Sequence, residues 1–373
     1  MSTIKVLEVI RQGEIGGGES HVLDLVSGFD KIRVTPIVMA FTNGHMIDAL
    51  TKQGIKCYVV ETNSAFDYKI QNKIIDIVRK ENIDIIHAHG SRAASNIIWP
   101  AKRLKKPLVY TVHGWSFHQD QSFWIQKIRA WSEKLICKCS QQVICVSDSN
   151  RLSGEKAFGL NSCHVIENGV NLKRFNPYGN NKDLHSQFDF SKDDIIVGLI
   201  ARITLQKDPL TFIKGIALAH KQNPQIKGLV IGEGDMKDEI TEYIKNHQMD
   251  SFIHTAPFRT DVPDILNTID IYCLPSLWEG LSIALLEAMA MRKPIIVTPT
   301  DGSKELIINE YNGLVVNFNS PDEIANACLQ YATTPTLKQQ CANAAYKLVE
   351  ERFNAQRVSD TVFNIYQNII AIR

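Results

Sequence analysis

Two glutamates, Glu279 and Glu287, lie eight positions apart where a short apolar run gives way to a helical pattern. The run 270–274 is apolar and bounded by turn residues, which is typical of a buried parallel strand. The composition of 282–291 predicts a helix. We therefore expect Glu279 in the turn after a strand and Glu287 about two turns further on, where carboxylates could hold a polyhydroxylated ligand.

The residues Gly280, Leu281 and Ser282 stand at the start of that predicted helix. Backbone N–H groups of a first helical turn have no partner within the helix, and the helix dipole favours an anion there. Ligands of open α/β sheets bind outside the carboxyl ends of the strands. This stretch therefore predicts a site for phosphate on the amides and for hydroxyl groups on the carboxylates.

Arg202 and Lys207 follow another predicted strand, and Asp208-Pro209 begins the next helix. A guanidinium fork and a compact ammonium together suit a diphosphate. Cations on such a loop are often merely solvated. Their expected position at the same sheet edge as Glu279 favours a binding role.

The turn 13–20 contains Gly16, Gly17 and Gly18 between the first predicted strand and the first helix. Consecutive glycines let a backbone approach a ligand closely, and the helix offers its first amides. The alternative is a plain strand-to-helix turn. The order Gly-x-Gly-x-x-Gly of a dinucleotide site is missing.

Two further turns end strands at the expected edge. Glu233 lies between two glycines, and Phe258 is followed by Arg259. Exposed backbone with an aromatic ring could hold a nucleobase, although a core phenylalanine is equally compatible with the pattern.

His113 ends a strand of the first half and is either a ligand contact or a histidine satisfied beside a turn. His87 and His89 share one face if extended, but no third metal ligand is evident near them. Cys137 and Cys139 lack a second ligand pair, and no Asp-x-Asp occurs. We therefore predict no bound metal and no cofactor.

Strand and helix patterns alternate along both halves of the chain, which predicts right-handed βαβ units and parallel sheets covered on both faces. The polar tract 178–194 separates the halves and is expected to be a linker. The predicted fold is α/β, with two Rossmann-like domains, 1–177 and 195–354. The predicted strands are 4–10, 34–41, 56–61, 84–89, 108–112, 143–147, 164–166, 195–203, 228–231, 252–256, 270–274, 294–298 and 313–316.

A chain of 373 residues is long enough for two domains. Its 41 basic and 40 acidic residues give no argument for a nucleic-acid partner. Eight cysteines in a chain of this size fit reduced core thiols. The N-terminus lacks a signal-peptide pattern and no apolar run is long enough to span a membrane, so a cytoplasmic location is expected.

The stretch 102–138 is locally basic and contains an apolar helical pattern. Such a helix either lies on an anionic membrane surface or is a core helix with a solvated rim. The basic residues are Lys102, Arg103, Lys105, Lys106, Lys127, Arg129, Lys134 and Lys138, and the apolar ones are Phe123, Trp124, Ile125, Ile128, Trp131, Leu135 and Ile136.

These motifs occur in an order that resembles the family 4 retaining glycosyltransferases of the GT-B fold. The resemblance extends over nearly the whole chain and is carried by Glu279 with Glu287, Arg202 with Lys207, Gly16 to Glu19, Thr111 to Gly114, and Asn168 to Asn171. It implies an active cleft between two Rossmann-like domains, an N-terminal domain that binds the acceptor, a C-terminal domain that binds the nucleotide sugar, and a last helix, within 355–373, that crosses back onto the first domain.

The resemblance also implies roles for individual residues. Glu287 would bind the ribose, Glu279 the transferred sugar, and Arg202 with Lys207 the diphosphate, helped by the amides of 280–282. His113 would lie beside the donor sugar, while Gly16 and Gly17 would close over the phosphate. The chain departs from the family pattern at Asp208 and Arg259, where glycine is common, and Arg259 weakens the nucleobase assignment.

The implied reaction is retaining transfer, without a metal, of a hexose or N-acetylhexosamine from a nucleotide sugar. The donor is expected to be a UDP-sugar. The acceptor is expected to be a glycan or a polyprenyl-diphosphate-linked glycan of surface polysaccharide or lipopolysaccharide synthesis. The alternatives are a sugar-nucleotide epimerase of the same fold and a non-catalytic sugar-nucleotide-binding protein, which would have little reason to retain Glu279.

Overall fold

The computed structural model describes residues 3–14, 16–117 and 121–372, and it divides into two compact units. The first unit comprises the described residues up to Gly169 together with those from Ala355 onward, and the second comprises Val170–Asn354. Ile15, inside the glycine-rich turn, and residues 118–120, inside the basic stretch, lie outside the described residues.

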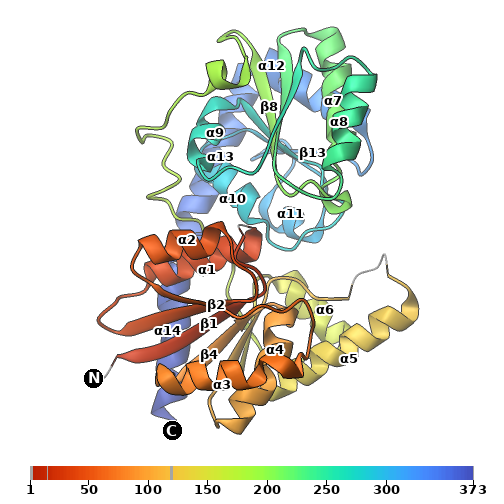
Figure 1. The fold of residues 1–373 in the computed structure, drawn as a ribbon. Coiled ribbons are helices and arrows are strands. Elements are labelled where there is room, and N and C mark those ends of the chain that lie inside the picture. The colour runs from red at the N-terminus through yellow and green to blue at the C-terminus, as the bar shows by residue number, and fades with distance from the viewer. Residues whose placement is uncertain (1–2, 15, 118–120, 373) are drawn as a thin grey trace. The chain divides into compact units, whose positions relative to one another are not determined.

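The first unit is built on a seven-stranded parallel sheet in the order β3-β2-β1-β4-β5-β6-β7 (Figure 1). Its strands are β1 Ile4–Ile10, β2 Val34–Ala40, β3 Lys56–Val59, β4 Ile85–His89, β5 Leu108–Val112, β6 Gln142–Cys145 and β7 His164–Val165. Its helices are α1 Gly17–Gly28, α2 His45–Lys52, η1 Tyr68–Ile70, α3 Gln71–Lys80, α4 Ser91–Arg103, α5 Phe123–Cys139, α6 Asp148–Phe158 and α14 Ala355–Ala371.

Alternate residues of β1 pack into different core clusters of this unit, because successive side chains of a strand point to opposite faces. Leu7 and Val9 join the cluster that includes residues of α3 and α4. Val6 packs in the cluster formed with α1 and α14, and Ile10 packs with α1 and α2. Apolar burial on both faces explains why β1 is a nearly continuous apolar run.

The second unit contains a six-stranded parallel sheet in the order β10-β9-β8-β11-β12-β13. Its strands are β8 Ile195–Ile200, β9 Ile226–Ile231, β10 Ile253–Ala256, β11 Ile271–Leu274, β12 Ile295–Val297 and β13 Leu314–Val315. Its helices are η2 His185–Phe188, η3 Leu205–Lys207, α7 Pro209–Gln222, α8 Lys237–Asn246, α9 Val262–Thr268, α10 Ile283–Ala290, α11 Asp301–Leu306, α12 Pro321–Thr333 and α13 Pro335–Arg352. One large core cluster lies within this unit.

The division between the units differs from the expected one. The tract 178–194, expected to be a linker, belongs to the second unit. Leu184, Phe188 and Phe190 are buried in that unit's core. Isolated large side chains in a polar tract carry no periodic signal, which is why the sequence indicated a linker.

Helix α14 belongs to the first unit, where it packs beside α1 (Figure 1). Ser359 Oγ donates to the carbonyl of Leu25 at 3.1 Å, and Gln356 donates to that of Gly28 at 2.9 Å. The last helix therefore completes the core that the N-terminal strands begin. Among the described residues no helix has the length and apolar character needed to cross a membrane.

Candidate active site

The strand order of the second sheet reverses between β8 and β11, which are neighbours although they are not consecutive. Ligands of open α/β sheets bind at such a reversal, beside the carboxyl ends of the strands. The loop after β8 carries Arg202 and Lys207, and the loop after β11 carries Glu279. The fold thus places the loop that carries the two cations beside the loop that carries Glu279, and it brings Lys207 to that carboxylate.

Lys207 forms an ion pair with Glu279, and only 11% and 9% of the two side chains are exposed. Ser276 Oγ also donates to Glu279 Oε1, at 2.8 Å. The loops are further joined by backbone, since Gln206 accepts from the amide of Leu277 at 2.8 Å and its side chain donates to the carbonyl of Trp278 at the same distance. Lys207 and Glu279 are therefore held in place, whereas Arg202 is exposed.

Asp208 lies at the N-cap of α7 with a left-handed backbone, φ 47°. Its carboxylate accepts a hydrogen bond from the amide of Thr211 at 3.2 Å. Aspartate tolerates this conformation better than most residues and caps helices well. The structure thus accounts for an aspartate at the position where the resemblance led us to expect glycine.

Helix α10 begins at Ile283, with Ser282 as its N-cap, one residue later than the sequence indicated. Ser282 Oγ accepts from the amide of Leu285 at 3.4 Å. Gly280, Leu281 and Ser282 therefore precede the first helical turn, and the first amides of the helix proper belong to Ile283 and Ala284. The expected boundary was displaced because Ser282 is itself a strong capping residue.

Glu287 lies within α10 and is buried, with 9% of the residue exposed. The phenol of Tyr272 on β11 lies close enough to the carboxylates of Glu287 and Glu279 for their charges to affect its ionisation. Burial raises the pKa of Tyr272 well above its ordinary value, and the charges of Glu287 and Glu279 raise it further. Glu287 and Glu279 are thus near one buried aromatic ring, on the helix and the loop that follow the same strand.

The Glu279 loop is closely packed against the start of α11. The amide of Gly302 donates to the carbonyl of Glu279 at 3.2 Å, and a Cβ at position 302 would lie 1.8 Å from the carbonyl oxygen of Gly280. Thr298 Oγ1 also donates to the carbonyl of Ser276 at 2.5 Å. Only glycine at 302 permits this approach, so Gly302 is a site-supporting residue that the sequence did not indicate.

Two predicted donor contacts have local partners instead. Glu233 is exposed and accepts from Lys237 one helical turn away, at 2.9 Å. Arg259 pairs with Asp261 at 2.5 Å, while Phe258 is partly buried. These contacts give the two charged side chains a structural explanation, and their predicted role toward a nucleotide stays a prediction.

The first sheet also reverses its order, between β1 and β4. Gly16 is the N-cap of α1 in the loop after β1, and Gly17 is the first residue of that helix. His113 directly follows β5. A Cβ at Gly18 would lie 3.5 Å from Cδ2 of His113, so the glycine-rich turn and this histidine are neighbours within the unit.

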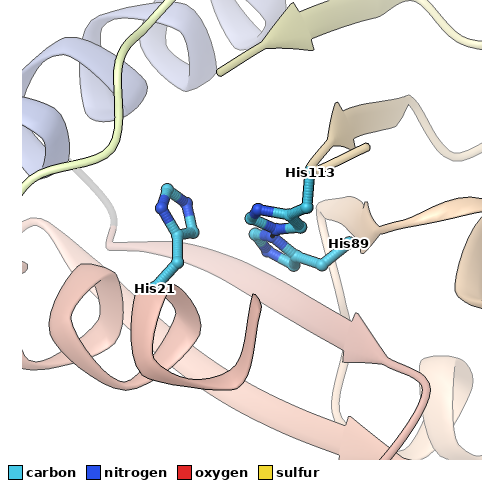
Figure 2. A group of neighbouring side chains, drawn as sticks. All are labelled: His21, His89 and His113. Carbon is cyan, nitrogen blue, oxygen red and sulfur yellow. Dashed lines mark hydrogen bonds between the residues drawn. The ribbon is translucent and has the colours of Figure 1, made fainter. Parts of the chain in front are cut away.

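His113 is one of three neighbouring histidines, with His21 on α1 and His89 at the end of β4 (Figure 2). His113 Nε2 and His89 Nδ1 are 3.2 Å apart. His21 meets His113 edge to face, with ring centroids 4.7 Å apart. The sequence indicated His89 and His113 separately and gave no signal for His21, because helix α1 brings it to them across a distance that no spacing rule describes.

A buried carboxylate lies behind these rings. Glu8 on β1 accepts from His89 Nε2 at 2.8 Å and from the Tyr366 hydroxyl of α14 at 2.9 Å. His87, also beside Glu8, has Nδ1 2.5 Å from the Tyr366 oxygen and Nε2 2.7 Å from Thr111 Oγ1. A charged residue inside an apolar strand is a detectable signal, since fully buried glutamates are rare unless paired.

Burial dominates the ionisation of this cluster. Burial, together with the neighbouring histidines, lowers the pKa of His21 to about 3 and that of His89 to about 4. The pKa of His113 also lies well below its ordinary value because of burial and the other imidazoles. Burial alone would raise the pKa of Glu8, but His87 and His89 outweigh it and lower that pKa. At neutral pH the cluster is thus a carboxylate with three neutral imidazoles.

Residues 15–174 match the family described as Glycosyltransferase Family 4, and residues 180–348 match the one described as Glycosyl transferases group 1. The chain belongs to the family 4 glycosyltransferases. The family assignment makes the two parallel-sheet units a GT-B fold and makes the protein a glycosyltransferase, as the resemblance implied.

Two curated relatives have specific names. The chain is 27% identical over 311 residues to an Escherichia coli UDP-Gal:alpha-D-GlcNAc-diphosphoundecaprenol alpha-1,3-galactosyltransferase, covering 82% of this chain and 80% of the relative. It is 26% identical to a Campylobacter jejuni N,N'-diacetylbacillosaminyl-diphospho-undecaprenol alpha-1,3-N-acetylgalactosaminyltransferase, covering 79% and 80%.

Solved structures share the fold over nearly the full length. An Anabaena HepE crystal structure in complex with UDP and glucose gives a TM-score of 0.86 at 19% identity, covering 98% of this chain and 99% of that one. WaaG, a glycosyltransferase involved in lipopolysaccharide biosynthesis, gives 0.78 at 14% identity, covering 96% and 99%. At these identities the similarity concerns the fold alone.

Proposed function

We propose that this glycosyltransferase moves a hexose or N-acetylhexosamine from a UDP-sugar to a polyprenyl-diphosphate-linked glycan in surface polysaccharide synthesis. Two relatives named for undecaprenyl-diphosphate-linked acceptors support this assignment, one of them with UDP-galactose as its donor. In this proposal the second unit holds the donor and the first unit holds the acceptor.

The observation that carries the proposal is the Lys207–Glu279 ion pair at the strand-order reversal of the second sheet. A lysine ammonium has three donors, so one can remain on Glu279 while the others reach phosphate oxygens. Arg202, exposed on the same loop, supplies a bidentate fork for the second phosphate. Glu279 thereby positions the lysine and leaves its own carboxylate beside the transferred sugar.

The proposed reaction retains the anomeric configuration. The acceptor hydroxyl attacks the anomeric carbon from the face that the diphosphate leaves. The bond to the leaving oxygen breaks, and the departing phosphate oxygen takes the acceptor's proton. Negative charge then gathers on the diphosphate, where Lys207, Arg202 and the start of α10 stabilise it. Glu287 binds the ribose hydroxyls and His113 contacts the donor sugar. These steps use no metal and no cofactor.

Helix α5 supports an acceptor that resides in a membrane. Its buried side is anchored by Glu133, which accepts from Tyr110 at 2.9 Å and from the amide of Ser116 at 3.1 Å. Of its seven apolar residues named above only Ile136 is buried. The remaining large apolar side chains are exposed beside Lys127, Lys134 and Lys138. A basic helix with exposed tryptophans suits the interface of an anionic membrane.

A panel of UDP- and GDP-sugars, offered with and without a polyprenyl-diphosphate-linked sugar, tests the proposal. We expect a UDP-sugar to be consumed only with the acceptor, in the presence of EDTA, and NMR of the product to show the donor's anomeric configuration. Isomerisation of the donor without acceptor would instead indicate an epimerase. Nucleotide-sugar binding without any turnover would indicate a binding protein.

A further inference from the structure

The hydrogen bonds to the buried Glu8 have a determined direction, because an ionised carboxylate can only accept. Glu8 is completely buried, and the two imidazoles beside it lower its pKa, so that it is ionised at neutral pH. His89 Nε2 lies 2.8 Å from Glu8 Oε2 and therefore carries a proton that it donates. The hydroxyl of Tyr366 donates to the other carboxylate oxygen at 2.9 Å.

His87 gives this carboxylate a further donor. Its Nδ1 lies 2.5 Å from the oxygen of Tyr366 and 3.2 Å from Glu8 Oε2. Since the proton of the Tyr366 hydroxyl is directed to Glu8, both of these oxygens accept, and His87 Nδ1 carries a proton. The donors on β4 and α14 thus hold Glu8 in one orientation, with Oε2 toward His89.

The direction of the hydrogen bonds continues from His89 to His113. Burial leaves both rings neutral at neutral pH, because it lowers the pKa of each. A neutral imidazole has one donor nitrogen and one acceptor nitrogen, and the bond made by one decides the role of the other. With its proton on Nε2, His89 accepts on Nδ1, which lies 3.2 Å from His113 Nε2. His113 therefore donates from Nε2, and its Nδ1 is an acceptor.

Packing holds the ring of His113 in this orientation. His21 meets it edge to face, with ring centroids 4.7 Å apart (Figure 2). A Cβ at Gly18 would lie 3.5 Å from Cδ2, on the edge of the ring opposite to Nδ1. Within the part of the chain that the structure describes, no residue forms a hydrogen bond with His113 Nδ1, and His113 is partly exposed. This nitrogen is thus available to a ligand that reaches the ring.

We propose that Glu8 and His89 are positioning residues that fix His113 in the tautomer with its proton on Nε2, so that Nδ1 accepts a hydrogen bond from a hydroxyl group of the donor sugar. The inference rests on the proposed function, in which His113 contacts that sugar. A site that hydrogen-bonds a substrate hydroxyl disfavours an analogue without it. The buried carboxylate therefore contributes to the choice of donor, although it does not touch the donor itself.

The first test needs no sugar nucleotide. In the full chain labelled with ¹⁵N-histidine, long-range ¹H–¹⁵N NMR spectra distinguish protonated from unprotonated ring nitrogens. The signals of His89 and His113 are assigned by their loss in His89→Gln and His113→Gln. We expect the proton on Nε2 of both rings at neutral pH. A proton on Nδ1 of His113 in the original chain would overturn the proposal, even where a variant fails to fold.

Glu8→Gln is the variant that tests the carboxylate, because an amide of nearly the same shape can donate toward His89 as well as accept. We expect the tautomer of His113 with its proton on Nδ1 to become populated. Ser359→Ala, which removes a buried hydrogen bond to Leu25 in the same unit, is the control and should keep the original tautomer. An unchanged tautomer of His113 in Glu8→Gln would overturn the role of Glu8.

The second test uses monodeoxy analogues of the UDP-sugar that the donor panel identifies. For the analogue without the contacted hydroxyl, we expect kcat/KM to fall about 10-fold in the original chain and in Ser359→Ala, the effect of one lost hydrogen bond. In Glu8→Gln the same comparison should give about 3-fold or less, whereas a general structural loss would lower both donors equally. Equal discrimination in Glu8→Gln and the original chain would overturn the proposal. Absence of transfer from every UDP-sugar would refute the proposed function and the sugar contact together, but not the tautomer.

Discussion

Glu279 Oε1 accepts hydrogen bonds from both Lys207 Nζ and Ser276 Oγ. A buried carboxylate held by one ammonium and one hydroxyl is fixed in orientation before any ligand arrives, so less ordering is required when the donor binds. The same ion pair limits the movement of Lys207. Preorganisation of this kind acts on the charge that develops during transfer more than on initial binding.

We expect Arg202→Ala and Lys207→Ala each to lower kcat by about 10²–10³-fold, the effect of removing one preorganised donor to a developing anion. The KM for the donor should change much less, because charge gathers on the diphosphate mainly in the transition state. Steady-state kinetics for each variant give both values. Lys347→Ala, an exposed lysine of the same unit, serves as the control, and an equal loss in binding and turnover would contradict the catalytic role.

Lys293 provides a pH prediction in the second unit. Burial lowers its pKa from 10.5 to about 8, although Asp270 acts in the opposite direction. Between pH 8 and 10.5 the unfolded chain therefore binds more protons than the folded one, and this residue makes the free energy of unfolding rise with pH, by at most about 1.4 kcal/mol per unit. Below pH 8 Lys293 is charged in the folded protein, and burial of that charge lowers the free energy of unfolding by its full amount.

Replacing Lys293 with Met should remove that rise. Urea unfolding of the original chain and of Lys293→Met at pH 7, 8, 9 and 9.5 gives the difference between them, in which the cysteines and tyrosines that titrate in both proteins cancel. We expect the variant's stability relative to the original chain to decrease as pH increases above 8. Parallel pH profiles would show that Lys293 keeps an ordinary pKa.

At the scale of elements, α5 differs from the other helices of the first unit in what it exposes. Trp124 is 75% exposed and Trp131 67% exposed, while the helix buries Glu133. Exposed tryptophans and a buried glutamate depart from the usual pattern of a surface helix, although Ala130 and Ile136 are buried on the same side as Glu133. If α5 lies on a membrane, as we propose, its exposed apolar side chains are buried in the membrane interface.

Replacing Trp124, Ile128 and Trp131 together with Ser should leave the fold intact, since all three are exposed. Flotation with vesicles that contain anionic phospholipid should then recover at least tenfold less of the variant than of the original chain. Ile32→Ser removes an apolar side chain that is 82% exposed elsewhere in the same unit and should float normally. Equal recovery of all three proteins, or no dependence on anionic lipid, would refute the membrane role of α5.

At the scale of the whole molecule, each unit has its own core, and the first is assembled from both ends of the chain. Val358, Val362 and Phe363 of α14 pack with Val6 of β1. Tyr366 supplies a hydrogen bond to the buried Glu8. Loss of a partner from a buried charge is strongly destabilising, so α14 contributes both apolar contacts and charge compensation.

Deletion of 355–373 should therefore unfold the first unit and leave the second able to bind UDP. Differential scanning calorimetry with and without UDP measures both effects. We expect a UDP-dependent transition to survive and the first unit's transition to be lost. Tyr366→Phe, which removes only the hydroxyl, should lower the first unit's melting temperature without abolishing it. A truncated chain with two unchanged transitions would contradict the role given to α14.

Much of the fold follows from local patterns. Apolar runs mark the strands because both faces of a parallel sheet are buried, and most expected strands differ from the observed ones by no more than two residues at either end. The expected strand 195–203 is longer than β8, which ends at Ile200, where the loop that carries Arg202 begins. The expectation that 178–194 is a linker was wrong, because the few large side chains of this tract are buried against the core of the second unit, and that contact is not visible in the sequence.

Local patterns in the chain are enough to establish the available chemistry and the fold class. Glu279 and Glu287, Arg202 with Lys207 and the glycine-rich turn are local in the chain, and periodicity and capping place them at strand ends. Which of these residues come into contact depends on how the strands pair. Strand order places β8 beside β11 and thereby brings Lys207 to Glu279. It also places β1 beside β4, so that His21, His89 and His113 lie close together and Glu8 bonds His89. Side-chain contacts between residues far apart in sequence depend on the order in which strands pair, and no local pattern encodes that order.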